Sequence, residues 1–332
     1  MAEQRPNGVS DPEVIDIIRS VEMRLGTRLR DARPLPGGHS GLTLTAERCD
    51  DREQIVIKAT PPGRTAVGRH DVLRQARAMR VAATGVPVPR LLASSDDPAW
   101  FVMSFEVGEA AEPAHDDAPS GDDTALVTAR FRVATEMLAR LHEVPVGPLS
   151  DGEAIVAPAD ELGKWERTLG AIDDGFSRAG REAFDALAGH VPRACGPVLV
   201  HGDYRLGNIL FDGPNAVAVI DWEIWSVGDP RVDLGWYLTF CDPSNFPSIG
   251  YLQRRLPSPV DVVGAYEAHA GRAVEELRWF LALGAFKMGV VMAHNLARHR
   301  SGRHVDPFQE RLPPTIEHLL GRAATLAAAP AP

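Results

Sequence analysis

The segment 197–221 constrains this chain more than any other, because it predicts a short apolar strand and then a β-hairpin inside an otherwise helical half of the sequence. Asp203 follows the first strand, and residues 212–215, DGPN, supply the turn of the hairpin. Asn208 and Asp221 stand at the two open ends of the hairpin. Because paired strands bring their ends together, we expect Asn208 and Asp221 to converge on one point.

These three residues suit the transfer of a phosphoryl group from ATP, a reaction that depends on positioning and on charge neutralisation. A carboxylate must accept or orient the proton of the attacking hydroxyl group, and Asp203 can do so. Hard oxygen ligands must hold Mg²⁺ against the phosphates, and Asn208 and Asp221 supply them. Each residue alone could be an ordinary turn or cap residue. All three at this spacing around a hairpin favour the catalytic interpretation.

The first half of the chain offers the cation and the flexible loop that the same reaction needs. The chain has only three lysines, Lys58, Lys164 and Lys287, and Lys58 lies in the predicted strand QIVIKA. Lys58 is therefore the candidate that fixes the α- and β-phosphates. Gly37 and Gly38 precede another predicted strand and allow close approach to phosphates. The order of glycine loop, strand lysine, helix, Asp-x-x-x-x-Asn and later Asp is that of the kinase signature.

The remaining pattern predicts an α+β, protein-kinase-like fold of two lobes. Residues 11–105 form a small β-rich lobe for nucleotide binding, with helices near 11–25 and 68–83 and strands near 28–35, 42–48, 54–59, 90–93 and 100–105. Residues 124–327 form a larger helical lobe for catalysis and substrate binding, with a helical stripe over 127–141 and further helices near 160–170, 177–190, 261–271, 275–300 and 313–327. Residues 106–123 are acidic and rich in Pro, Gly and Asp, which predicts an exposed hinge and connector. Residues 1–10 are expected to be disordered, and 328–332 form a tail.

Composition narrows the possible partners. The net charge of −10, with no run of Lys and Arg, argues against nucleic acid as a partner. This charge is compatible with a cationic substrate, although solubility alone explains it. Cys49, Cys195 and Cys241 are odd in number and widely spaced, which predicts reduced thiols in a cytoplasmic protein. The N-terminus has no apolar signal core, and the most apolar stretch, 279–292, is too short to span a membrane, so we read it as a buried helix.

The segments HGDYRLGN and IDWEIWSVGDPRVDLG resemble the aminoglycoside phosphotransferase family, also called the phosphotransferase enzyme family. Five segments of the first lobe resemble the branch that includes the kinase-like domains attached to some acyl-CoA dehydrogenases. They are LPGGHSGLTL, KATPPGR, RHDVLRQARAM, TGVPVPRLLA and FVMSFEVG. The resemblance covers about residues 30–300, and the motif around Asp203 is its most specific part.

The resemblance implies a role for each matching residue. It implies that Asp203 is the catalytic base, that Asn208 and Asp221 bind Mg²⁺, and that Lys58 binds phosphate. His201 would brace the catalytic loop, and Glu223 would reach a second metal or a substrate amine. The residues implied to bind the nucleotide are those of the glycine loop and of the hinge, which reads adenine through backbone groups: Gly37, Gly38, Ser40, Met103, Ser104, Phe105, Glu106 and Val107.

One position departs from the family pattern. Gln75 stands where the family usually has Glu, the ion-pair partner of the strand lysine, and an amide offers a hydrogen bond but no charge. Three explanations follow: another carboxylate substitutes, Lys58 is held less firmly, or the register of this helix is shifted by one turn.

Other residues near the motif have plainer interpretations. Asp229 is predicted to cap a helix, and Asp233 to lie in its first turn, where its charge suits the helix dipole. A bond from Asp233 to the catalytic loop is the lesser alternative. Arg205 either contacts phosphate or pairs with an acid. The tryptophans of this region are expected to serve packing: Trp222, Trp225 and Trp236.

The sequence therefore predicts an ATP- and Mg²⁺-dependent kinase of small molecules. Its acceptor is the hydroxyl group of an antibiotic (an aminoglycoside or a macrolide), of a hydroxyacyl compound or hydroxy acid, or of another metabolite alcohol. Segments 143–175 and 240–262 are expected to line the acceptor site. The alternative is a nucleotide-binding regulator that does no chemistry, which only Gln75 supports.

Overall fold

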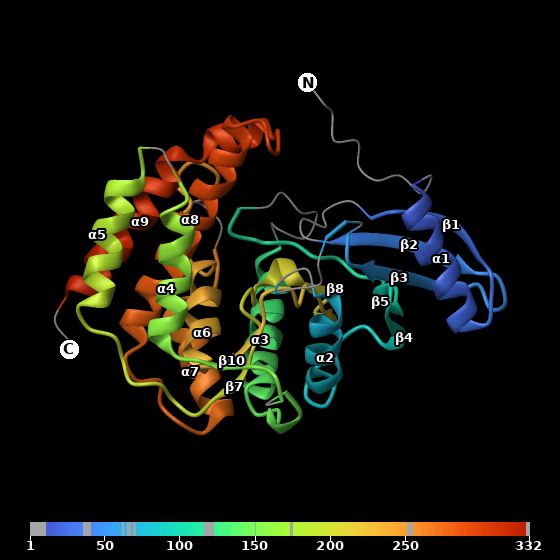
Figure 1. Ribbon diagram of the computed structural model, residues 1–332. Helices are drawn as coiled ribbons and strands as arrows, with labels where there is room; N and C mark the ends of the chain where they lie inside the picture. Colours follow the sequence, from blue (N-terminus) through green and yellow to red (C-terminus); the bar gives the residue numbers. More distant parts are fainter. Residues whose placement is uncertain are drawn as a thin grey trace.

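The computed structural model describes residues 11–35, 41–61, 63–64, 68, 71–115, 123–149, 151–172, 175–250 and 255–329. These residues form two lobes, a smaller one built around a β-sheet and a larger one of helices (Figure 1). Helices α2 and α3 and strand β8 lie between the two. The predicted disorder of residues 1–10 and the glycine loop at Gly37, Gly38 and Ser40 fall outside the described residues.

The smaller lobe is a five-stranded antiparallel sheet in the order β1-β2-β3-β5-β4. Its strands are β1 (Leu29–Pro34), β2 (Leu42–Arg48), β3 (Gln54–Ala59), β4 (Leu91–Asp96) and β5 (Ala99–Ser104). Helix α1 (Pro12–Leu25) begins at the cap Asp11 and packs its apolar stripe on one face of the sheet. Ile55, Ile57 and Ala59 of β3 face α1. Because side chains alternate along a strand, Lys58 projects from the opposite face, toward helix α2.

Helix α2 (Val72–Ala82) is fixed to the larger lobe as well as to the sheet. Its apolar residues belong to the same core as those of α3 (Thr124–Leu141). The Arg74 guanidinium pairs with Glu153, with 3.0 Å between Nε and Oε1, and donates to the carbonyl of Trp225. The Trp225 indole donates back to the carbonyl of Arg74 at 3.0 Å. These contacts hold α2, and with it Gln75, against the helical lobe.

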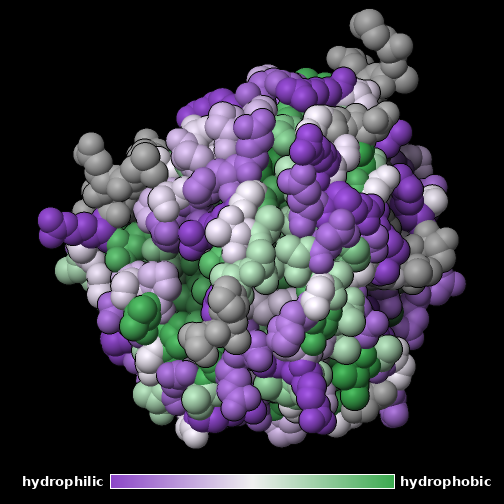
Figure 2. All heavy atoms as spheres, turned by 90° about the vertical axis from the view of Figure 1, so that its left-hand side faces the viewer, coloured by the Kyte–Doolittle hydropathy of each residue, from purple (hydrophilic) through white to green (hydrophobic). Residues whose placement is uncertain are grey.

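Among its described residues, the larger lobe has two small sheets beside its helices, the hairpin β8–β9 and the three-stranded sheet β6-β10-β7. Its helices are α3, α4 (Pro158–Leu169), α5 (Ser177–Ala188), α6 (Pro230–Thr239), α7 (Pro259–Ala270), α8 (Leu277–Arg300) and α9 (Pro313–Ala328). Its strands are β6 (Ile155–Val156), β7 (Val198–Val200), β8 (Ile209–Asp212), β9 (Asn215–Val219) and β10 (Ser226–Gly228). Figure 2 views this lobe from outside, where hydrophobic residues gather in patches among hydrophilic ones.

Helix α8 is long and apolar enough to cross a membrane, but 72% of its most apolar window is buried inside the protein. It crosses α6 at close range, because Gly284 brings α8 against the carbonyl of Gly235. A Cβ atom added at Gly284 would lie 2.6 Å from that oxygen. The burial is that of a core helix, as predicted for residues 279–292.

Most predicted elements of both lobes are present within one to three residues of their expected ends. Two predictions were wrong. Strands β6 and β10 were missed, since two or three residues leave no periodic signal. The connector 106–123 was expected to be exposed, yet residues 111–114 are buried and the Glu112 side chain is fully enclosed. The Glu112 carboxylate accepts a hydrogen bond from the Gly207 N–H at 3.2 Å, which ties the connector to the loop that follows β7.

Candidate active site

The loop after β7 is held in shape by one buried carboxylate. Asp233, in the first turn of α6, accepts hydrogen bonds from the backbone N–H groups of His201 at 2.7 Å and Gly202 at 2.8 Å. Burial alone would raise the pKa of Asp233, but the bonds to His142 and to the loop hold it below its ordinary value. Asp233 therefore does more than complement the helix dipole: it makes the loop contact that was predicted as the lesser alternative.

His201 lies where a brace of the loop should be. Its Nδ1 accepts the Asp203 N–H at 3.2 Å, so Nε2 carries the proton and donates to the carbonyl of Ile220 at 3.0 Å. The ring is buried and packs on Trp222, with 4.5 Å between centroids. The neutral imidazole thus joins the catalytic loop to the backbone that carries Asp221.

The Asp203 carboxylate is oriented from two sides. Its Oδ2 accepts a hydrogen bond from Asn208 Nδ2 at 2.8 Å, and its Oδ1 accepts one from the Trp236 indole at 2.8 Å. Arg205 Nε lies 3.5 Å from Oδ1 and pairs also with Glu112, so Arg205 contacts acids in this structure. Trp236 was expected only to pack. An indole has a single polar atom, and nothing in the sequence indicates which acid it reaches.

Asn208 and Asp221 lie at the open end of the hairpin, as the sequence predicts. The Ile220 N–H donates to the Asn208 carbonyl at 2.9 Å, which closes the hairpin between them. Asn208 uses its amide nitrogen on Asp203, both at the backbone oxygen and at Oδ2, and this leaves Oδ1 on the opposite side of the amide. Asp221 has a φ of +65°. An amide oxygen and a carboxylate are the donors that Mg²⁺ takes beside nucleotide phosphates, so these residues fit such an ion.

The pKa of the Asp221 carboxyl group is set by the protein groups that surround it in the cleft. Its side chain is accessible to solvent, yet protein surrounds it closely. Burial, Glu223 and Asp203 raise its pKa, and Lys58 acts in the opposite direction. A nearby cation favours the ionised form of such a carboxylate.

Lys58 meets two partners in the cleft. Its Nζ lies 3.1 Å from Oε1 of Gln75 and 3.4 Å from Oε1 of Glu223. The register of α2 was therefore right, and another carboxylate, that of Glu223, does reach the lysine, which is the first of the three predicted explanations. Lys58, Gln75 and Asp221 line a small cavity between the lobes, together with Met103 of β5.

The predicted hinge runs out of β5. The N–H groups of Ser104 and Phe105 are already used in the sheet, on the carbonyls of Arg90 at 2.9 Å and Gln54 at 3.1 Å. Backbone N–H donors to adenine would therefore come from Glu106 and Val107. The connector is pinned soon afterwards, because Glu109 exchanges two backbone hydrogen bonds with Phe211 of β8, at 2.8 and 2.9 Å.

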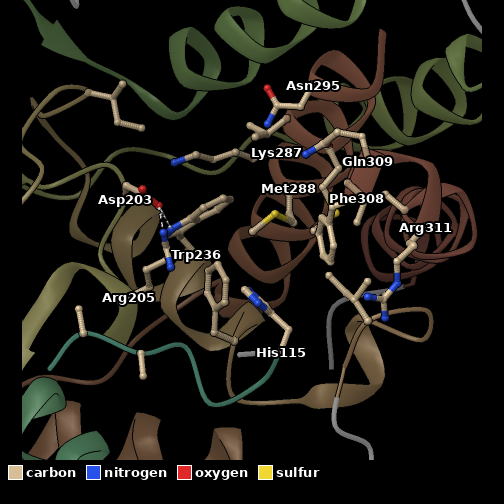
Figure 3. Close-up of a pocket in the computed structure, with 18 of the residues that line it drawn as sticks. His115, Asp203, Arg205, Trp236, Lys287, Met288, Asn295, Phe308, Gln309 and Arg311 are labelled. Atoms are coloured by element: carbon tan, nitrogen blue, oxygen red, sulfur yellow. Dashed lines mark hydrogen bonds and ion pairs between the residues drawn. The ribbon is translucent and has the colours of Figure 1, made fainter. Parts of the chain in front are cut away.

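A pocket of about 810 Å³ opens beside Asp203 in the helical lobe (Figure 3). Part of its wall comes from α8 and from the segment that leads into α9. These segments contribute the apolar Met288, Val291, Met292, Phe308 and Leu312 and the polar Lys287, Asn295, Gln309 and Arg311. Of the segments expected to line an acceptor site, 143–175 and 240–262, the described residues that reach it are Trp165, Phe240 and Ile249. The lining residues of α8 were missed because the sequence of this helix is that of a core helix.

Among the described residues, basic side chains slightly outnumber acidic ones around this pocket. Its basic lining residues are Arg205, Arg311 and Lys287, and its acidic ones are Glu109 and Asp203. The acidic net charge of the whole chain is therefore not reflected here. Asp203 lines this pocket, and its bond to Asn208 links it to the hairpin end whose Asp221 lines the small cavity with Lys58.

Comparison with known proteins places these features in a wider group. The sequence model of the phosphotransferase enzyme family matches residues 31–280. Acyl-CoA dehydrogenase family member 10 of Mus musculus is 26% identical over 77% of this chain, and the match spans only 25% of that longer protein.

Solved structures show the same fold. A protein of Ralstonia eutropha, provisionally described as an aminoglycoside phosphotransferase, superimposes with a TM-score of 0.75 at 22% identity, over 91% of this chain and 93% of its own. Spectinomycin phosphotransferase, solved with ADP and spectinomycin, gives 0.60 at 14% identity, over 95% and 97%. These likenesses establish the kinase-like fold.

Proposed function

Because the chain belongs to the phosphotransferase enzyme family, we propose that it transfers the γ-phosphoryl group of ATP to a hydroxyl group of a small molecule. One observation carries the proposal. Asp203 lines the large pocket of the helical lobe and is bonded, through Asn208, to the hairpin end that also bears Asp221. A base placed between an acceptor pocket and a phosphate-binding cleft is what this transfer requires.

The reaction would proceed with Asp203 as the base. Its carboxylate takes the proton of the acceptor hydroxyl while the oxygen attacks the γ-phosphorus. The new O–P bond forms as the bond from that phosphorus to the bridging oxygen of ADP breaks, and ADP leaves with the electron pair. Lys58 neutralises phosphate charge. Mg²⁺, when bound by Asn208 and Asp221, would add charge neutralisation at the phosphates.

Other parts of the nucleotide site follow from the family. Gly37, Gly38 and Ser40 would cover the phosphates, and the hinge at Glu106 and Val107 would contact adenine. ADP bound to spectinomycin phosphotransferase supports ATP as the donor. A cytoplasmic location stays a prediction.

The lining of the pocket bears on the choice among the predicted acceptors. An aminoglycoside carries several positive charges and would need several carboxylates, and the described residues that line the pocket include two acids, Glu109 and Asp203, of which Asp203 is the proposed base. The apolar side chains of α8 suit an acceptor with a hydrocarbon body, and the exposed Arg311 suits an anionic group, whereas Arg205 is engaged by Asp203 and Glu112 and Lys287 is enclosed. We therefore favour a hydroxyacyl compound or hydroxy acid, with a macrolide next.

The rival function, a regulator that binds nucleotide without chemistry, loses its one support. That support was Gln75, which gives Lys58 no charged partner. Glu223 supplies the carboxylate from the other side of the lysine, at 3.4 Å. An ion pair at Lys58 is thus available to a working enzyme.

The test is ADP release from Mg-ATP against a panel of aminoglycosides, macrolides, hydroxyacyl-CoAs, hydroxy acids and amino alcohols. Stimulation by one class in the wild type, lost in Asp203→Asn while ATP still binds, is the expected result. Equal turnover in Asp203→Asn would refute the assignment of the base. Tight ATP binding with no stimulation by any class would favour the regulator.

A further inference from the structure

Lys287 is a lysine in an unusual place. It lies in the middle of α8, and its side chain is almost wholly enclosed, with 2% of its surface exposed. Burial lowers its pKa, while the negative charges of Glu161, Asp203 and Asp233 favour the ammonium form. An apolar side chain of this size would fill the same space without the cost of desolvating a cation, so packing alone does not explain a lysine here.

The ammonium group sits among parts of the catalytic machinery. It donates a hydrogen bond to the carbonyl of Gly202, the residue before Asp203. It also lies 4.1 Å from the ring centroid of Trp236 and 5.1 Å from that of Trp165. Figure 3 shows the Lys287 side chain reaching toward Asp203 and Trp236. No other lysine of the chain contacts this loop in the structure's described residues.

Each of the two indoles donates its N–H to a carboxylate. Trp236 donates to Asp203 at 2.8 Å, and Trp165 donates to Glu161 at 2.7 Å. The cation therefore lies against two aromatic rings, each tied to an acid. Attraction between a cation and a ring strengthens when both are removed from water, as they are here. The arrangement fixes the plane of the Trp236 ring and thereby the direction of its N–H.

We propose that Lys287 is a positioning residue for the catalytic base, acting through the Gly202 carbonyl and the Trp236 indole to hold the Asp203 carboxylate toward the acceptor pocket. The inference rests on the proposed function, since it takes Asp203 as the base. It predicts an effect on turnover rather than on nucleotide binding, because Lys287 lies on the acceptor side, away from Lys58.

Four variants test the role. Lys287→Met removes the charge at nearly constant volume, Lys287→Arg restores a cation, and Trp236→Phe removes the indole N–H. Lys164→Met is the matched control. The Lys164 Nζ also lies over Trp165, 5.0 Å from the ring centroid, but its side chain is 38% exposed and its ion pair is with Glu161, not with the loop at Gly202. Turnover with the best acceptor, the Kd for Mg-ATP and the melting midpoint are measured for each.

The expected pattern is a split between turnover and binding. In Lys287→Met, kcat falls by at least about tenfold, toward the roughly hundredfold that a misplaced catalytic group costs, while the Kd for Mg-ATP stays within about twofold. Lys287→Arg recovers part of the loss, and Lys164→Met matches the wild type. Combining Lys287→Met with Trp236→Phe gives less than the product of the two losses, because both act through one contact.

A second measurement needs no turnover. The indole N–H signal of Trp236 in a ¹H–¹⁵N spectrum, assigned by its loss in Trp236→Phe, should move in Lys287→Met and stay in Lys164→Met. An unmoved Trp236 signal in Lys287→Met, or a kcat of this variant within about twofold of wild type, overturns the proposal. Equal losses of nucleotide binding, stability and turnover in Lys287→Met also overturn it, because they show a structural role only. If the wild type is inactive with every acceptor, the proposed function fails, and the spectrum still decides whether Lys287 holds Trp236.

Discussion

Replacing Asp233 by Asn should destabilise the protein substantially. Asp233 is fully buried and accepts two backbone hydrogen bonds, at 2.7 and 2.8 Å, from consecutive residues of the catalytic loop. An amide has only one oxygen, so its NH₂ group would face one of these donors and leave a buried N–H unpaired. An unpaired buried donor costs about 1–3 kcal/mol, and the lost charge on the remaining bond adds about 1 kcal/mol, so we expect a loss of about 3 kcal/mol.

Thermal unfolding measures this loss. An unfolding entropy of about 2.1 cal/mol/K per residue gives roughly 1.4 °C per kcal/mol for a chain of 332 residues, so the melting midpoint should fall by about 4 °C. Asp123→Asn is the matched control, because Asp123 also accepts two backbone N–H groups at a helix start but uses one oxygen for both and is exposed. Asn caps helices as well as Asp does, so this control should melt with the wild type.

The pH dependence gives the same prediction a second check. The pKa of Asp233 is lowered on folding, so its contribution is complete above the ordinary value of 3.8 and is lost as the pH falls through the lower folded value. The difference in melting midpoint between wild type and Asp233→Asn should therefore be constant near neutral pH and shrink only below about pH 4. A variant that melts within about 2 °C of the wild type at pH 7 would refute the account of the loop.

Two further predictions concern the cleft and the core. Glu223→Gln should lower the rate of ADP release about tenfold, because Lys58 then keeps only the neutral Gln75 amide as a partner. Adding Gln75→Glu should restore the rate, since the Gln75 side chain already lies 3.1 Å from the lysine, and failure of this rescue would assign Glu223 another role. Gly235→Ala should lower the melting midpoint by at least about 3 °C, because the alanine Cβ would lie 2.2 Å from the Phe280 carbonyl oxygen and force α6 and α8 apart. An unchanged melting midpoint would contradict this packing.

The parts of the site predictable from the sequence are those set by local chain geometry. Asp203, Asn208 and Asp221 lie within one short stretch, and the turn at 212–215 forces the hairpin that brings the last two together. The pairing of Lys58 with Gln75 followed from the family resemblance, because Gln75 stands at the position of the usual Glu partner of the strand lysine. The lobes themselves follow from the change from period 2 to period 3.6 along the chain.

The parts that sequence did not reveal depend on contacts between distant segments. Glu223 reaches Lys58 across 165 positions, and Trp236 reaches Asp203 across 33. Tryptophan is usually a packing residue, and Lys287 lies within an otherwise apolar stretch of helix. The neighbouring sequence therefore does not indicate which residues Trp236 and Lys287 contact. The connector near Glu112 is polar in composition, yet tertiary pairing buries it.

Transfer of label from γ-labelled ATP to the acceptor, in wild type and in Asp203→Asn, tests the central claim most directly. We expect labelled acceptor from the wild type and, from the variant, a loss of about 10²–10⁴-fold, the range that a positioned base supplies, with ATP binding retained. Labelled acceptor at the same rate from both proteins would contradict the assignment of Asp203 as the base of a phosphotransferase.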